Sequence, residues 1–241
     1  MNTGKRLQAL IQSHPPFVLP VSGAVAWWDA TQITGLTDGD SVSTWSNQFL
    51  IAYPLVSTAG TPPVYKVGIQ NGLPVVRFGG AGGLRAAAVT IDDFTIFMVV
   101  NPVPSPAMIY EHSDNWNWGQ GSGVYWGGDS FCMVNRNFQE SYQTAVPGGL
   151  PAVFQILEHR YASGLLYPSR VYVNDVLVAE GTEGVTTLSP QSCDLAFNVG
   201  SRGGNSLFSA MDVGEIIVYP RLLSNDDCAT IEAYLYNKWF A

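Results

Sequence analysis

The C-terminal segment constrains the fold of this chain more than any other part of the sequence. Its pattern predicts a strand over Asp212–Tyr219, a tight turn, and one amphipathic helix over Asn225–Trp239. Ser224 suits the N-cap of this helix because its hydroxyl can accept a free amide of the first turn. We expect the apolar stripe of the helix to close the edge or end of a β-rich fold. That stripe consists of Ile231, Tyr234, Leu235 and Trp239, which recur at helical spacing.

Upstream of this segment, short strand-like runs alternate with Gly, Pro and Asn turns. A strand is predicted over Phe94–Asn101, and its segment Phe94–Val100 (FTIFMVV) is apolar at nearly every position, which is typical of a strand covered on both faces. Arg170–Ala179 predicts a hairpin, because Asn174 and Asp175 tolerate the positive φ values of a two-residue turn. The pattern favours an all-β, antiparallel two-sheet jelly-roll sandwich with one C-terminal helix. The other predicted strands are Ala24–Asp29, Pro74–Phe78, Val124–Trp126, Phe131–Asn135, Ala152–Glu158 and Asp194–Gly200.

A proline stop near the N-terminus divides the chain into an arm, residues 1–20, and one domain, residues 21–241. Pro15 and Pro16 end any helical turn before them. We expect the arm to order against a neighbouring subunit, with a frayed tail as the alternative. The candidate assembly residues of the arm are Leu7, Leu10, Ile11 and Phe17.

Charge and composition exclude several classes of partner. The net charge of −8 argues against nucleic acid, since phosphate binding needs clustered Lys and Arg. The sequence has no signal-peptide core and no apolar run long enough to predict membrane insertion. The spacing of Cys132, Cys193 and Cys228 matches no zinc pattern, so we expect buried free thiols.

Nearly the whole chain resembles the concanavalin A-like, laminin-G-like jelly-roll domains. The matching opening residues are Ala26-Trp27-Trp28-Asp29-Ala30, Ile33-Thr34-Gly35-Leu36, Asp38-Gly39-Asp40, Val42 and Trp45-Ser46-Asn47. The next matches are Pro63-Val64-Tyr65, Pro74-Val75-Val76-Arg77-Phe78-Gly79-Gly80, Leu84 and the hairpin Val171-Tyr172-Val173-Asn174-Asp175. The matching C-terminal residues are Gly214-Glu215-Ile216-Ile217-Val218-Tyr219, Arg221, Leu223-Ser224, Tyr234-Leu235 and Lys238-Trp239. This opening and ending also resemble domains of tailed-bacteriophage virion proteins.

The superfamily that the chain resembles includes lectins, surface modules and glycan-cleaving enzymes, so the resemblance alone does not choose between recognition, assembly and catalysis. We expect a non-enzymatic structural protein of a phage virion: a capsid decoration, tail or fibre component. Such a protein would assemble in the host cytoplasm, form a homo-oligomer and bind other virion proteins through its arm. The alternative is a carbohydrate-binding or receptor-binding adhesin that is extracellular or on a cell surface, with a host-surface glycan as its partner. A glycan-active hydrolase is the most distant reading.

The sequence offers little support for catalysis. Glycan hydrolases on this fold need carboxylates on one face of a strand, and no acid–x–acid–x–acid pattern is present. Glu215 is an isolated acid, which we expect to point outward or to be hydrogen-bonded. No G-x-S-x-G elbow accompanies the scattered histidines. We therefore expect no enzymatic activity and no catalytic residues.

The stretch from Asp114 to Asp129 (DNWNWGQGSGVYWGGD) is the candidate carbohydrate site. Its aromatic rings can stack on sugar faces while its Asn and Asp side chains bind hydroxyls. The alternative is that these tryptophans pack in the core or against a neighbouring subunit. The stretch and Asn135 also carry oxygen ligands for a calcium ion, but we expect no metal or other cofactor. The candidate carbohydrate residues are Asp114, Trp116, Asn117, Trp118, Tyr125, Trp126 and Asp129.

Overall fold

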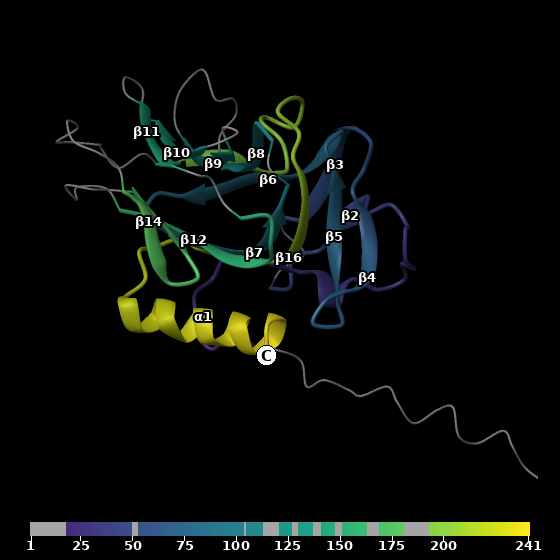
Figure 1. The fold of residues 1–241 in the computed structure, drawn as a ribbon, viewed down its shortest axis with the longest axis horizontal. Helices are drawn as coiled ribbons and strands as arrows, with labels where there is room; N and C mark the ends of the chain where they lie inside the picture. The colour runs from purple at the N-terminus through teal and green to yellow at the C-terminus, as the bar shows by residue number, and fades with distance from the viewer. Residues whose placement is uncertain are drawn as a thin grey trace, which may run out of the picture.

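The computed structural model describes residues 18–49, 53–103, 105–112, 121–126, 130–136, 141–147, 151–162, 169–180 and 193–241. These residues form two antiparallel β-sheets packed face to face, and helix α1 (Asn225–Trp239) lies along the outside of one sheet (Figure 1). Within the described ranges, α1 is the single α-helix. The architecture confirms the predicted all-β, two-sheet jelly-roll sandwich with one C-terminal helix.

The sheet beneath α1, called here the helix-covered sheet, brings the two ends of the described chain together. Its strands run in the order β14-β13-β12-β7-β16-β5-β4 in the described residues, and β1 pairs with β16 beside this path. Ala26 of β1 pairs with Val218 of β16. The strands are β1 (Ala26–Asp29), β4 (Val64–Gln70), β5 (Leu73–Gly79), β7 (Phe94–Pro102), β12 (Gln155–Tyr161), β13 (Ser169–Val173), β14 (Val176–Glu180) and β16 (Ala210–Tyr219).

The opposite sheet runs in the order β11-β10-β9-β8-β15-β6-β3-β2 over the described residues. Each strand predicted from the sequence is present in one of the two sheets, with small shifts of its ends. The sequence did not predict six further strands: β2, β3, β4, β6, β8 and β11. A short 3-10 turn, η1 (Ala30–Gln32), follows β1. The strands are β2 (Thr44–Trp45), β3 (Leu55–Gly60), β6 (Gly82–Ile91), β8 (Ala107–His112), β9 (Gly121–Trp126), β10 (Ser130–Arg136), β11 (Ser141–Pro147) and β15 (Cys193–Val199).

Two apolar cores stabilise this arrangement. The larger core fills the space between the sheets and contains Trp28 and Trp45. The second core lies between α1 and the outer face of the helix-covered sheet, where Phe97 meets Leu235 and Trp239. β7 contributes to both cores, and its buried run confirms the prediction that both faces of this strand are covered.

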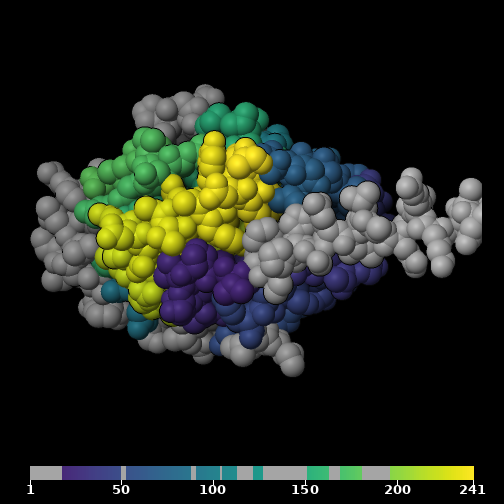
Figure 2. Space-filling model, turned by 90° about the horizontal axis from the view of Figure 1, so that it is seen from below, coloured from purple at the N-terminus to yellow at the C-terminus, as the bar shows by residue number. Residues whose placement is uncertain are grey.

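The position of α1 corrects one expectation. We expected the helix to close the sandwich at an edge or end, but it lies across the outer face of the helix-covered sheet (Figure 2). Trp27, Phe97 and Ile217 point outward from three strands of that sheet and need an apolar cover. The stripe of α1 supplies it: Ile231, Leu235 and Trp239 are buried, and Tyr234 is partly buried.

Gly214 lets the helix approach the sheet closely. It sits at a register shift where β16 leaves its pairing with β5 and begins to pair with β1. A Cβ atom at this position would lie 2.7 Å from the Trp239 ring. The residue is therefore glycine because the indole occupies the space of a side chain.

A candidate ligand groove beside the C-terminal helix

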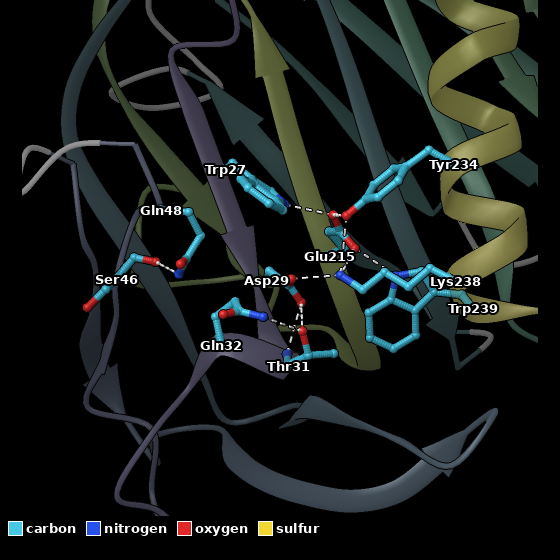
Figure 3. Close-up of polar contacts among 10 residues, drawn as sticks. All are labelled: Trp27, Asp29, Thr31, Gln32, Ser46, Gln48, Glu215, Tyr234, Lys238 and Trp239. Carbon is cyan, nitrogen blue, oxygen red and sulfur yellow. Dashed lines mark hydrogen bonds and ion pairs between the residues drawn. The ribbon is translucent and has the colours of Figure 1, made fainter. Parts of the chain in front are cut away.

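The C-terminal end of α1 is anchored by a buried ammonium between two carboxylates (Figure 3). Lys238 Nζ lies 2.6 Å from Asp29 Oδ2 and 2.7 Å from Glu215 Oε2. Asp29 ends β1 and also caps η1 by accepting the Thr31 amide at 2.9 Å. The ion pairs therefore connect the last helix to the first and last strands of the helix-covered sheet.

The Glu215 carboxylate is saturated with donors, as the hydrogen-bonded alternative for this residue predicted. The Trp27 indole donates to Oε1 at 2.7 Å and the Tyr234 hydroxyl donates to it at 2.9 Å. The Trp239 indole donates to Oε2 at 2.8 Å. Burial, followed by the nearby charge of Asp29, raises the pKa of Glu215, and Lys238 opposes that rise. Asp29 and Glu215 are both fully buried. Their cluster with Lys238 therefore holds the helix on the sheet and does not present carboxylates to a ligand.

The N-terminal end of α1 is anchored by a second charge pair on β12. The Arg160 guanidinium donates from Nη2 to Glu158 Oε2 at 3.0 Å and from Nη1 to Asn225 Oδ1 at 2.7 Å. The same guanidinium lies 4.2 Å from the centre of the Tyr172 ring, a cation–π contact. Both ends of the helix are thus fixed on the sheet by charged groups as well as by apolar packing.

A groove of about 490 Å³ runs between α1, the start of β12 and the turn of the β13–β14 hairpin. Figure 2 looks onto this face, with α1 in yellow and the hairpin in green beside it. Asn174 fixes the hairpin wall through two hydrogen bonds to Ile156. Its side-chain oxygen accepts a hydrogen bond from the Ile156 backbone N–H at 2.9 Å, and its own backbone N–H donates to the Ile156 carbonyl at 2.9 Å. The lining residues are Phe154, Ile156, Asn174, Asp175, Ala229, Glu232, Ala233, Tyr236, Asn237 and Phe240.

Aromatic residues form much of the accessible wall. Tyr236 is 57% exposed and stacks on Phe240, with 5.8 Å between ring centres and 16° between ring planes. The half-buried Phe154 lies on the β12 side of the same groove. Sequence reasoning missed these residues, because Tyr236 and Phe240 fall outside the apolar stripe of the helix. Their i, i+4 spacing on a second face of the helix was the available signal.

Glu232 places one carboxylate in this groove although its side chain is largely buried. Its Oε1 accepts the Asp175 backbone amide at 3.2 Å. Burial raises the pKa of Glu232 to about 7, and the nearby charges of Glu158 and Asp175 add to the rise. The groove therefore contains an acid that changes its charge near neutral pH.

The sequence-predicted aromatic stretch is only partly within the described residues. Trp126 is 2% exposed and belongs to the core between the sheets, and Tyr125 is half-buried. Burial of Trp126 agrees with the alternative that tryptophans of this stretch pack in the core. The candidates Asp114, Trp116, Asn117, Trp118 and Asp129, and the arm residues Leu7, Leu10, Ile11 and Phe17, lie outside the described residues. A glycan site along this stretch and an assembly role of the arm stay predictions.

The structure also describes several other groups that the sequence points to. Cys228 is a buried free thiol, as predicted. Among the described residues, no group of three or more His, Cys, Asp or Glu side chains could hold a metal ion. In the described part of the chain, no helix is long and apolar enough to cross a membrane. His159 lies inside the sandwich, bonded to the Tyr110 hydroxyl through Nδ1 and 2.7 Å from Ser169 Oγ through Nε2.

No protein-family model and no curated protein matches this sequence. Solved structures do resemble the fold. Domain 4 of AbnA, an extracellular arabinanase from Geobacillus stearothermophilus, in complex with arabinotriose, has a TM-score of 0.65 and 14% identity, covering 88% of this chain and 100% of that domain. The binding domain of Paraclostridial Mosquitocidal Protein 1 has a TM-score of 0.60 and 10% identity, covering 90% of this chain and 52% of the other. Trypanosoma rangeli sialidase in complex with sialic acid has a TM-score of 0.59 and 13% identity, covering 92% of this chain and 34% of the enzyme.

These similarities show that the chain has a β-sandwich fold that also occurs in domains of other proteins. At such identities the likeness shows the fold and does not show a shared activity. The chain spans about half the length of the toxin domain and about a third of the length of the sialidase. None of the structures named here is a phage protein, so the virion role expected from the sequence stays a prediction.

Proposed function

We propose that this protein is a non-enzymatic carbohydrate-binding module that recognises a glycan in the groove beside α1. The observation that carries the proposal is the composition of the groove. The exposed ring of Tyr236 and the half-buried ring of Phe240 can stack on the C–H faces of a sugar. The side chains of Asn174, Asn237 and Glu232 offer donors and acceptors for hydroxyl groups along the same wall.

The size and rigidity of the groove suit a short oligosaccharide. A volume of about 490 Å³ falls within the usual range of small-molecule sites. Charged groups fix α1 on the sheet at both ends, and Asn174 fixes the hairpin on β12. A preformed wall keeps the entropy cost of binding low, which favours measurable affinity for a weakly apolar ligand.

The comparisons support a binding role over an assembly role. The AbnA domain was solved with arabinotriose, and the mosquitocidal protein and botulinum neurotoxin type G structures are described as binding domains. By this proposal the module acts at an extracellular or virion surface and has a host-surface glycan as partner. The arm, residues 1–20, would attach it to the larger assembly.

A glycan array followed by calorimetry tests the proposal. We expect the wild-type protein to bind a defined set of oligosaccharides, and Tyr236→Ala to weaken that binding at least tenfold, or about 1.4 kcal/mol. Val67→Ala is the matched control, because Val67 is also about half exposed but lies on β4 at the other edge of the helix-covered sheet. Absence of binding to every arrayed glycan, or equal binding by wild type and Tyr236→Ala, would overturn the proposal.

A further inference from the structure

We infer that the groove beside α1 binds a cationic ligand, specifically an oligosaccharide that carries a protonated amino group. This inference rests on the proposed glycan-binding function and names the chemical class of the sugar. It is carried by the pairing of a buried carboxylate with an aromatic wall in one groove.

The Glu232 carboxylate is only half satisfied by the protein. The side chain is 8% exposed, and its Oε1 accepts the Asp175 amide. Among the described residues, no donor reaches its second oxygen, although Glu232 lines the groove. This second oxygen is open to the groove, so a ligand that brings a donor can bind there.

The charges around Glu232 select a cation rather than a neutral donor. Glu158 is paired with Arg160, but its negative charge acts on Glu232 more strongly than the positive charge of Arg160 does. Asp175 stands beside Glu232 without compensation from the groove wall, because the described lining residues include two acids and no base. Cys228, the other titratable group near this end of α1, has its pKa raised by burial and stays neutral. The groove therefore has a negative potential that repels uronic and sialic acids and attracts an ammonium.

The aromatic wall favours the same group. A cation near an aromatic face gains electrostatic energy from the ring quadrupole, and the gain is larger where water is excluded. Tyr236, Phe240 and Phe154 line the groove that contains Glu232. An amino sugar would place its ammonium at Glu232 while its ring stacks on Tyr236, so one ligand uses both parts of the site.

Isothermal titration calorimetry at pH 5.5 with two matched sugars tests the inference. The probes are a tetramer of β-1,4-linked glucosamine and the same tetramer fully N-acetylated, which lacks the charge. We expect the glucosamine tetramer to bind at least tenfold more tightly. The amino groups of the sugar already carry their protons at this pH, so binding should release the proton of Glu232, seen as a buffer-dependent enthalpy.

Two variants separate a cation site from a general sugar site. Glu232→Gln keeps an acceptor for the Asp175 amide and should remove both the tenfold preference and the proton release. Glu180→Gln, on the same hairpin but paired with Arg170 at 3.0 Å, is the control and should change neither.

The outcomes distinguish failure of the inference from failure of the proposed function. Equal binding of both tetramers, lost in Tyr236→Ala, overturns the cationic ligand and leaves the glycan module standing. Binding of choline that depends on Glu232, with no binding of any sugar, keeps the cation pocket but overturns the amino sugar and the glycan function together. A preference that survives in Glu232→Gln overturns the assignment of the carboxylate.

Discussion

The ammonium of Lys238 lies 2.6 Å from the carboxylate of Asp29, although 209 positions separate the two residues in sequence. One belongs to the last turn of α1 and the other ends β1, so the contact fastens the end of the chain to its first strand. Both side chains are fully buried. Because Glu215 completes the cluster, the docking of α1 depends on a cation that compensates two acids away from water.

Lys238→Met is expected to destabilise the protein strongly. The substitution leaves Asp29 and Glu215 buried beside each other without their counter-charge, and removing one partner of a buried pair costs about 3–5 kcal/mol. Urea denaturation at pH 7.5 measures the loss in the free energy of unfolding. The loss should shrink at pH 5, because the pKa of Glu215 is already raised and its carboxyl takes a proton more readily without Lys238.

Lys66→Met provides the control for that experiment. Lys66 pairs with Asp38 at 2.5 Å, but both side chains are accessible to solvent. An exposed pair contributes less than about 1 kcal/mol. Similar losses for both variants would show that the buried cluster does not anchor the helix.

Gly214→Ala should displace α1 from the sheet. The added methyl group would lie 2.7 Å from the Trp239 ring, which has apolar neighbours on the other side. Overpacking of this kind typically costs about 1–3 kcal/mol. Thermal unfolding should show the loss, and near-ultraviolet circular dichroism should show a changed tryptophan environment. Gly79→Ala is the control, because a Cβ there meets no atom within 4 Å; an equal loss in both variants would contradict the close-approach argument.

The stability of the protein should fall as pH rises through neutrality, because of Glu232. Its pKa is raised to about 7 in the folded protein from 4.5 in the reference state. The protonated Glu232 carboxyl stabilises the folded protein fully below pH 4.5, and this stabilisation is lost as the pH rises from 4.5 to about 7. The free energy of unfolding of Glu232→Gln should therefore exceed that of the wild type by about 1–3 kcal/mol at pH 8, and the two should converge near pH 4.5. A constant difference between them at all pH values would contradict this expectation.

His159 should resist protonation far below its ordinary range. Burial lowers its pKa to about 3, and the neutral ring is hydrogen-bonded to the Tyr110 hydroxyl through Nδ1 and to the Ser169 hydroxyl through Nε2. The stabilisation from a neutral ring is complete above pH 6.5 and is lost as pH falls toward 3, the opposite direction to Glu232. In NMR spectra the ring signals should not shift between pH 8 and pH 4.5. A midpoint near 6.5 would show that the ring is open to solvent.

Local chemistry explains which elements were predictable from the sequence. The predicted start of α1 is confirmed, because the Ser224 hydroxyl accepts a hydrogen bond from the Asp227 backbone N–H at 3.1 Å, a contact within one turn. The predicted β13–β14 hairpin is confirmed, because Asn174 and Asp175 take the expected positive φ values of 48° and 62°. These features depend on neighbours in the chain, so the sequence alone contains the information.

Elements whose formation depends on distant partners were missed. β6 begins with Gly82 and Gly83 and continues through alanines, which have low strand propensity, yet it pairs with both β3 and β15. The stripe of α1 shows that one side is buried but not which surface buries it. The groove combines β12, a hairpin turn and a second face of α1, and no sequence period relates these three segments.

The proposed glycan site has two candidate locations, the groove and the aromatic stretch from Asp114 to Asp129, and a pair of variants decides between them. We expect Tyr236→Ala to weaken glycan binding at least tenfold with little change in melting temperature, because the ring is 57% exposed. We expect a double variant, Trp116→Ala with Trp118→Ala, to leave the affinity unchanged. Trp126 from the same stretch packs in the core, whereas Tyr236 lines an open groove, and this difference favours the groove. Loss of binding in the double variant at an unchanged melting temperature, with full binding by Tyr236→Ala, would move the site to the aromatic stretch.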